Sequence, residues 1–335
     1  MIPGAGAPLA LGPGDVLVLR ALGLGDALTG VAALRGVRRA WPGRRLVLAA
    51  PAAPGAFLAG HGVVDVVLPA AGPGPIAVGG PGGHVAVDLH GRGPESHRAL
   101  AATRPARLVA FACPEAGHAG PPFRADEHEV DRWCRLVRAA GGPCGRADLR
   151  LDVPAAPERD LVLLHPGAAS GSRRWPEDRW GALGARLAAA GRRVAVTGSA
   201  GERALCGAVA AACGPGTRDL SGTLDLDGLA AVVAGAGLLV CGDTGVAHLA
   251  TALGTPSVLL FGPTPPRWWG PALDHDRHVV LWRGAPDHRG DPHADALDPA
   301  LAALTVGEVA DAAHAVLAHP VRPLAVAAAP RDRTP

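Results

Sequence analysis

Two glycine-rich segments contain residues that could bind a phosphate group. One is Gly23-Leu24-Gly25-Asp26, which follows a short apolar run, and the other extends from His165 to Pro176 and includes Arg173 and Arg174. Small residues let the backbone approach a ligand closely, the start of a helix attracts anions, and arginine adds formal charge. The second segment therefore predicts a phosphate site; an ordinary solvent-exposed loop is the alternative.

The first segment does not match the fingerprint of a dinucleotide-binding turn. That fingerprint requires a small residue at position 28, where this chain has Leu28, and the carboxylate of Asp26 would repel a bound pyrophosphate. On local grounds alone, Asp26 is interpreted as the N-cap of the helix that follows, a position that aspartate favours.

Acidic and hydroxyl side chains follow two apolar runs in the second half of the chain. Asp243 and Thr244 precede a helix, which they could cap while backbone amides bind phosphate. His248 lies one turn into that helix, and the alternative for it is a buried, hydrogen-bonded histidine. Glu202 follows a Gly/Ser turn, where a Rossmann-like unit presents an acid to ribose hydroxyls; a solvated acid is the alternative. The polar loop at residues 287–295 lacks the spacing of a known metal site and is predicted to lie at the surface.

The composition limits the classes of protein to which the chain can belong. Its 335 residues include 32 basic and 30 acidic side chains, and the net charge of +2 excludes nucleic-acid binding by bulk electrostatics. The chain has no lysine, so arginine can stand where a related protein has lysine. Its six cysteines show no metal-ligand spacing and are expected to be reduced thiols in the cytoplasm. Neither a signal peptide nor an apolar stretch of roughly 18–20 residues is found, so no transmembrane segment is predicted.

Short apolar runs alternate with segments of helical periodicity, and these elements must position the polar residues. Strands are predicted at residues 16–19, 46–50, 63–68, 85–89, 161–165, 194–197, 238–241, 256–261 and 278–282. Helices are predicted at residues 26–40, 126–140, 176–190, 225–235 and 305–317, with two more that begin after Glu202 and after Gly245. This alternation is typical of two Rossmann-like domains, whose ligands bind beyond the carboxyl ends of parallel strands.

The chain is divided accordingly into four parts. They are a flexible N-terminus (residues 1–14), a first Rossmann-like domain (15–150), a second (151–318) and a frayed tail (319–335). A linker rich in proline, alanine and charge, at residues 143–160, separates the two domains, and the last helix could pack back on the first domain.

In their order and spacing, these motifs resemble glycosyltransferase family 9, the ADP-heptose heptosyltransferases and their relatives. The most specific parts are the Leu-Gly-Asp turn at residues 24–26, the loop from His165 to Pro176, and the segment Asp-Thr-Gly-x-x-His followed by Phe-Gly-Pro-Thr at 261–264. Weaker agreement comes from residues 87–91 and 128–132. The family implies an α/β GT-B fold, in which two Rossmann-like domains with parallel sheets face a central cleft.

The resemblance also implies an activity and a set of site residues. The activity is an inverting, metal-independent transfer of a sugar from a nucleotide diphosphate donor, by default heptose from ADP-heptose, to a glycan or lipid-linked acceptor. Asp26 matches the family's proposed general base, and Arg173 matches the lysine that holds the donor's sugar-proximal phosphate. The other donor-side positions, in the second domain, are Gly167, Ala168, Ser170, Ser199, Glu202, Leu224, Asp243, Thr244, Gly245 and His248. The acceptor-side positions, in the first domain, are Gly25, Arg92 and His128.

The chain departs from the family pattern at the phosphate loop. Some heptosyltransferases have threonines where this chain has Ala168 and Ala169, and Ser170 or Ser172 could substitute for them. The donor could therefore be another nucleotide sugar. A sugar-nucleotide epimerase of the same fold and a catalytically silent nucleotide-binding scaffold remain alternatives. No cofactor or metal is expected; the family label implies lipopolysaccharide assembly, and the expected location is cytoplasmic, with peripheral contact at the membrane surface left open.

Overall fold

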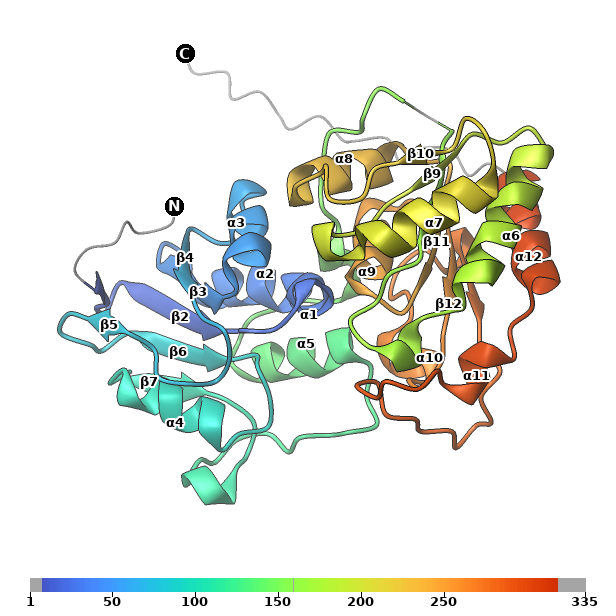
Figure 1. Ribbon diagram of the computed structural model, residues 1–335. Helices are drawn as coiled ribbons and strands as arrows, with labels where there is room; N and C mark the ends of the chain where they lie inside the picture. The colour runs from blue at the N-terminus through green and yellow to red at the C-terminus, as the bar shows by residue number, and fades with distance from the viewer. Residues whose placement is uncertain (1–7, 159, 319–335) are drawn as a thin grey trace, which may run out of the picture.

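Two parallel β-sheets, each flanked by helices, form the protein. The computed structural model describes residues 8–158 and 160–318 of the chain. The first part of the chain (blue to light green in Figure 1) surrounds one sheet, and the second part (yellow-green to red) surrounds the other. The predicted frayed tail, residues 319–335, lies outside the described residues, as do residues 1–7 of the predicted flexible N-terminus.

The remainder of the predicted flexible N-terminus forms part of a separate two-stranded sheet and packs against the first sheet, so that part of the prediction is wrong. Strand β1 (Leu9–Ala10) pairs in parallel with β5 (Val78–Gly79), and the amide of Leu11 donates to the carbonyl oxygen of Gly79 at 2.9 Å. The side chain of Leu11 is fully buried in the apolar cluster on one face of the sheet. This burial explains the attachment, because an apolar side chain gains free energy when it leaves water.

The first sheet has five parallel strands in the order β4-β3-β2-β6-β7. They are β2 (Asp15–Leu19), β3 (Arg45–Ala50), β4 (Val66–Pro69), β6 (Val85–Asp88) and β7 (Arg107–Val109). Strands β2 and β6 are buried on both faces, which is why they consist of almost uninterrupted apolar residues. The strand order reverses between β2 and β6, and ligands of open parallel sheets bind at such a reversal.

The second sheet has six parallel strands in the order β10-β9-β8-β11-β12-β13. They are β8 (Val162–His165), β9 (Val194–Val196), β10 (Arg218–Asp219), β11 (Leu238–Gly242), β12 (Ser257–Leu260) and β13 (His278–Leu281). Its order reverses between β8 and β11, whose C-terminal ends lead into the predicted phosphate loop and into Asp243. Each sheet therefore has one topological switch point.

Helices cover both faces of the two sheets. Those of the first part are α1 (Leu24–Thr29), α2 (Val31–Ala40), α3 (Ala52–Gly60), α4 (Glu95–Ala102) and α5 (Glu129–Ala139). Those of the second part are α6 (Glu177–Ala189), α7 (Arg203–Cys213), α8 (Leu226–Gly235), α9 (Gly245–Leu253), α10 (Pro266–Trp269), α11 (Pro299–Ala302) and α12 (Val306–Ala318).

The structure divides one predicted helix, begins the helix predicted at residues 126–140 at Glu129, and packs the last helix differently from the expectation. The predicted helix at residues 26–40 is divided at Gly30, where a Cβ atom would lie 2.8 Å from Cδ of Arg20, so the Arg20 side chain occupies the space beside the break. The last helix does not pack back on the first part of the chain. It packs against α6 and the second sheet through the buried residues Val309, Ala310 and Ala313.

The two parts of the chain are packed together through α1 and α9, which lie next to each other between the sheets (Figure 1). One apolar cluster is continuous across this contact and includes Leu28 and Val130 from the first part and Val246 and Leu249 from the second. The contact brings the two switch points to the same region of the molecule.

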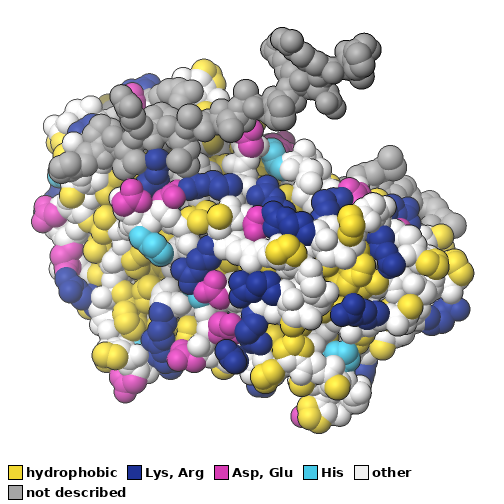
Figure 2. All heavy atoms as spheres, turned by 180° about the vertical axis from the view of Figure 1, so that it is seen from behind, with side chains coloured by type: hydrophobic (Ala, Val, Ile, Leu, Met, Phe, Trp, Pro, Cys, Tyr) yellow, Lys and Arg dark blue, Asp and Glu magenta, His cyan; other side chains and the backbone are white. Residues whose placement is uncertain are grey.

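Charges of both signs are distributed over the surface. On the face turned away from the view of Figure 1, arginine side chains lie among acidic ones over much of the area (Figure 2). This mixture agrees with the small net charge of +2. Within residues 8–158 and 160–318, helices of the length and apolar character needed to cross a membrane do not occur.

Candidate active site

Asp26 lies at the contact between the two parts of the chain. It is the third residue of α1, and Gly23 is the N-cap, so the interpretation of Asp26 as the cap is wrong. The helix begins two residues earlier than predicted because Gly23 already has an extended backbone (φ −66°, ψ 179°). The side chain of Asp26 is 29% exposed, and its Oδ1 atom lies 3.7 Å from Nη2 of the buried Arg20.

The surroundings of Asp26 change its affinity for a proton. Burial raises the pKa of Asp26, the guanidinium of Arg20 lowers it, and the carboxylate of Glu129 raises it again. Arg173, from the second part of the chain, also lowers it. A carboxylate that is partly buried and still faces solvent can accept a proton from a bound hydroxyl group.

Glycines allow the close approach of α1 and α9. A Cβ atom at Gly25 would lie 2.9 Å from Cδ2 of His248, and one at Gly245 would lie 2.9 Å from Cβ of Leu24. Real Cβ atoms do not approach so closely, so any larger residue at either position would push the helices apart. Gly25 and Gly245, predicted on the acceptor and donor sides respectively, therefore face each other's helices.

The predicted phosphate loop follows β8 and ends in a short 3-10 turn, Gly171–Arg173. The Arg173 side chain donates from Nε to Oγ of Ser170 (3.3 Å) and from Nη1 to the backbone oxygen of Asp243 (3.2 Å). Ser170 in turn donates its hydroxyl proton to the carbonyl oxygen of Pro292. These contacts fix the guanidinium of Arg173 next to the end of β11.

Asp243 follows β11 and is almost fully buried, with 7% of its surface exposed. Burial raises its pKa to about 6; the nearby Arg173 opposes this rise, and the negative charge of Asp26 adds to it. The structure thus brings Asp26, Arg173 and Asp243 together, although they come from three separate segments of the sequence. Thr244 is the N-cap residue of α9, with no hydrogen bond from its side chain to the first turn.

Glu202 is held in place by a neighbouring turn. Its Oε2 atom accepts hydrogen bonds from the amide and the hydroxyl of Ser199, both at 2.8 Å. A Cβ atom at Gly167 would lie 2.0 Å from Oε1 of Glu202, so the carboxyl group rests directly on the glycine of the phosphate loop. The predicted donor-side residues Gly167, Ser199 and Glu202 therefore meet. Ala168 is buried in the same loop, and Leu224 is half-buried before α8.

His128 and His248 line one small, mainly apolar cavity between α1, α5 and α9. Burial lowers the pKa of His248 to about 3, with further lowering by the charges of His128, Arg20 and Arg173, so its ring is neutral. His128 caps α5 by accepting from the amide of Val130 at 3.3 Å. Arg92, the other predicted acceptor-side residue, is exposed after β6 and is not part of this group.

A sequence profile of glycosyltransferase family 9 (heptosyltransferase) matches residues 124–293, just over half of the chain. The chain belongs to glycosyltransferase family 9. Among curated proteins, it is 42% identical over 158 residues to lipopolysaccharide heptosyltransferase 1 of Pseudomonas aeruginosa, and the aligned region covers 44% of each chain. It is 29% identical over 171 residues to lipopolysaccharide heptosyltransferase 2 of Salmonella typhimurium, and this aligned region covers 50% of this chain and 49% of that protein. The matches thus extend over about half the length of these relatives or less.

Solved structures of the family share the fold over nearly the whole chain. The Escherichia coli ADP-heptose lipopolysaccharide heptosyltransferase II has a TM-score of 0.72 at 18% identity and covers 91% of this chain and 98% of its own. The glycosyltransferase family 9 protein of Veillonella parvula has a TM-score of 0.73 at 16% identity, covering 92% and 99%. Together with the two parallel sheets described above, these likenesses establish the α/β GT-B fold that the sequence predicts.

One residue that the structure places beside Asp26 is not predicted from the sequence. Arg20 is the residue after β2, and its side chain reaches Asp26, yet only Gly25 and Asp26 are selected from this region of the sequence. A charged residue at the end of an otherwise apolar buried strand was the available signal, because a buried charge requires partners. Within the described ranges, clusters of three or more His, Cys, Asp or Glu side chains suited to a metal ion do not occur.

Proposed function

We propose that this family 9 protein is an inverting glycosyltransferase that transfers heptose from ADP-heptose to a glycan or lipid-linked acceptor. The observation that carries this proposal is the convergence of Asp26, Arg173 and Asp243 where the switch points of two parallel sheets meet. The names of the relatives, which are lipopolysaccharide heptosyltransferases, support heptose as the sugar and lipopolysaccharide as the class of acceptor.

In the proposed reaction, Asp26 acts as the general base. The acceptor hydroxyl oxygen attacks the anomeric carbon of the donor from the side opposite the diphosphate, while its proton passes to the Asp26 carboxylate. The bond between the anomeric carbon and the diphosphate oxygen breaks, and the diphosphate leaves with the electron pair. The rise in the pKa of Asp26 caused by burial makes its carboxylate a better proton acceptor than an exposed aspartate.

Arg173 is proposed to stabilise the leaving diphosphate. Its guanidinium is fixed by two hydrogen bonds and lies beside the phosphate loop, so little rearrangement is needed when charge develops. Asp243 is proposed to bind sugar hydroxyls, Glu202 the ribose, and Leu224 the base. Gly167, Ala168, Ser170, Ser199, Thr244, Gly245 and His248 are proposed to complete the donor side, and Gly25, Arg92 and His128 the acceptor side.

Location and metal dependence belong to the same proposal. We infer a cytoplasmic enzyme that works at the membrane surface, where a lipid-linked acceptor would be found. The six free cysteines fit a reducing compartment. We expect EDTA to leave the rate of transfer unchanged, because Arg173 and backbone amides supply the positive charge for the diphosphate.

The test is a transfer assay of the full chain with ADP-heptose and a lipopolysaccharide-core acceptor, with and without the acceptor. Release of ADP and a heptosylated product only when the acceptor is present would support the proposal. Conversion of the donor in the absence of an acceptor would indicate the epimerase instead, and donor binding without any conversion would indicate the silent scaffold.

Asp26→Asn provides the internal check on mechanism. We expect the rate to fall by about 10²–10⁴-fold, the usual contribution of a general base. Binding of ADP, measured by calorimetry, should persist because Asp26 belongs to the acceptor side of the contact. Full activity of Asp26→Asn would remove this residue from the mechanism.

A further inference from the structure

Behind Asp26, the buried Arg20 connects three segments of the first part of the chain. Its Nε atom donates to the backbone oxygen of Asp26, and Nη1 donates to the backbone oxygen of Leu89. Its Nη2 atom donates to Oγ1 of Thr29 at 3.0 Å and to Oε1 of Glu129 at 3.2 Å. Each of the three guanidinium nitrogens therefore donates at least one hydrogen bond, and the side chain is only 1% exposed.

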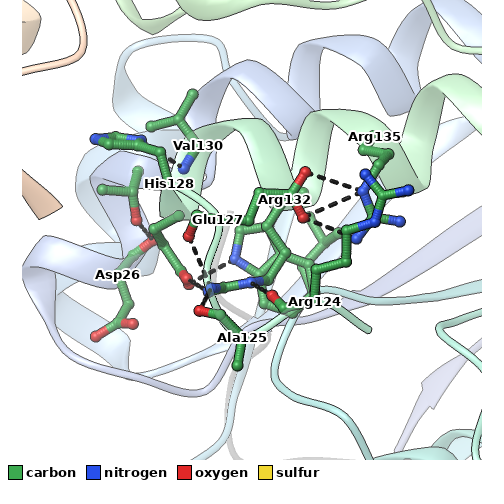
Figure 3. A network of polar contacts seen from close by, with 12 residues as sticks. Asp26, Arg124, Ala125, Glu127, His128, Val130, Arg132 and Arg135 are labelled. Carbon is green, nitrogen blue, oxygen red and sulfur yellow. Dashed lines mark hydrogen bonds and ion pairs between the residues drawn. The ribbon is translucent and has the colours of Figure 1, made fainter. Parts of the chain in front are cut away.

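Glu129, the first residue of α5, is the counter-charge of Arg20. Its Oε1 atom also accepts from Nε1 of Trp133 at 2.6 Å, and its Oε2 atom accepts from Arg132. The Arg20 guanidinium lies 5.1 Å from the centre of the Trp133 ring. Arg132 in turn donates to backbone oxygens of the segment before α5, at Arg124, Ala125 and Glu127 (Figure 3).

The four charged side chains of this cluster sum to zero, and only Asp26 is substantially exposed. Its side chain is 29% exposed, against 1% for Arg20, 6% for Glu129 and 11% for Arg132. Figure 3 shows the carboxyl group of Asp26 pointing away from Arg132 and Arg135. Asp26 is therefore the member of the cluster that a bound hydroxyl group can reach.

We propose that Arg20 and Glu129 are positioning residues that set the charge state of Asp26. Arg20 fixes the backbone of Asp26 and keeps its carboxylate ionised, and Glu129 offsets the positive charge of Arg20 so that Asp26 still accepts a proton. This inference rests on the proposed function, in which Asp26 is the base.

The other ionisable groups that face Asp26 come from the remaining elements at the contact. Arg173 contributes a positive charge, and Asp243 contributes a negative one with a pKa of about 6. His248 of α9 is neutral because burial lowers its pKa to about 3. His90, which follows β6, lies beside Arg20 rather than against Asp26, and burial lowers its pKa. Asp243 is the other aspartate whose charge interacts with that of Asp26, so the test must distinguish the two carboxyl groups.

The test is a titration of the full chain labelled with ¹³C at the aspartate carboxyl carbons. The spectra of Asp26→Asn and Asp243→Asn assign the two signals. Arg20→Gln removes the positive charge, and we expect the titration of Asp26 to move upward by about one pH unit or more, the usual effect of losing an opposite charge at this distance. Glu129→Gln removes the negative charge, and the titration should move downward.

Two further variants control for structural effects. Arg20→Lys keeps the charge and should leave the titration of Asp26 near that of the parent chain, even where it lowers the free energy of unfolding. Arg135→Gln removes a charge from α5, the helix that contains Glu129. Arg135 binds Glu127 (2.8 Å), so this variant should not move the titration of Asp26. If Arg20→Gln does not fold, Glu129→Gln and Arg20→Lys still decide the question.

The pH profile of kcat/KM tests the same inference in turnover. The acid limb of the profile should move to higher pH in Arg20→Gln and to lower pH in Glu129→Gln. Unchanged titrations, or shifts in the same direction for both variants, would overturn the inference. Opposite shifts of the carboxyl signal in a chain that transfers no sugar would support the charge relationship and contradict the proposed function instead.

Discussion

The Nε2 atom of His128 lies 3.0 Å from the backbone oxygen of Gly270, which ties the start of α5 to the second part of the chain. Nearby, Oδ1 of Asp126 accepts from Nε1 of Trp268 at 2.6 Å. Because Glu129 follows His128 directly, this contact also fixes the counter-charge of Arg20. His128 was predicted on the acceptor side, and both of its ring nitrogens are engaged within the protein.

The first prediction concerns this contact. His128→Ala removes the cap of α5 and the bond to Gly270, and we expect it to lower the free energy of unfolding by about 1–2 kcal/mol. Activity should fall as well, because Glu129 loses its support. Thermal unfolding and kcat/KM measure the two effects, with His314→Ala on the outer surface of α12 as the matched control. A His128→Ala chain as stable and active as the parent would contradict the assignment.

The second prediction concerns the close approach of α1 and α9. Gly25→Ala places a methyl group 2.9 Å from the ring of His248, so the two helices must separate. We expect a cost of about 1–3 kcal/mol in unfolding free energy, the usual effect of overpacking, and a clear loss of transfer. Gly307→Ala, in α12, is the control because its nearest neighbour would be 3.8 Å away. Equal unfolding free energies for the two variants in denaturant would show that α1 and α9 can separate without loss of stability.

Most of the fold could be predicted from the sequence because its elements are local patterns. The predicted strands at 16–19, 46–50, 85–89 and 238–241 lie within one residue of β2, β3, β6 and β11 at each end. The close packing of Arg20 against Gly30 could not be predicted, because the two residues come from different elements. The sheet on which α12 packs could not be predicted either, since the apolar side of this helix would fit either sheet.

Only those residues of the candidate site that belong to a recognisable sequence motif could be predicted. Asp26, Arg173 and Asp243 stand in glycine-rich turns after strands, and turns of this kind are visible in the sequence. Their meeting depends on how two sheets pack, which periodicity does not encode. The same limit applies to Arg20 and Glu129, which are separated by 109 residues and paired only in three dimensions.

The third prediction concerns the donor phosphate. Arg173→Ala removes a fixed positive charge beside the phosphate loop, and we expect kcat to fall by about 10²–10³-fold. Affinity for ADP, measured by calorimetry, should also fall. Arg173→Lys keeps the charge but loses the bonds to Ser170 and Asp243, so it should recover part of the affinity. Arg186→Ala, on the exposed face of α6, serves as the control. Normal ADP binding by Arg173→Ala would place the diphosphate elsewhere.

The last prediction concerns stability in acid. His278, at the start of β13, is buried; its Nδ1 atom lies 2.8 Å from Oγ of Ser257, and burial lowers its pKa from 6.5 to about 4. The folded state therefore disfavours the protonated ring. Between pH 6.5 and about 4 the unfolded chain binds more protons, so the free energy of unfolding decreases as the pH falls.

The loss attributable to His278 should reach about 3 kcal/mol once the pH is below 4, from 1.36 kcal/mol per pKa unit. Urea unfolding at a series of pH values measures it. The dependence on pH should be shallower in His278→Ala than in the parent chain, whatever the variant's stability at neutral pH. His314→Ala, which changes an exposed histidine of α12, should keep the parent slope. Equal slopes for His278→Ala and the parent would show that His278 has the same pKa in the folded and unfolded states.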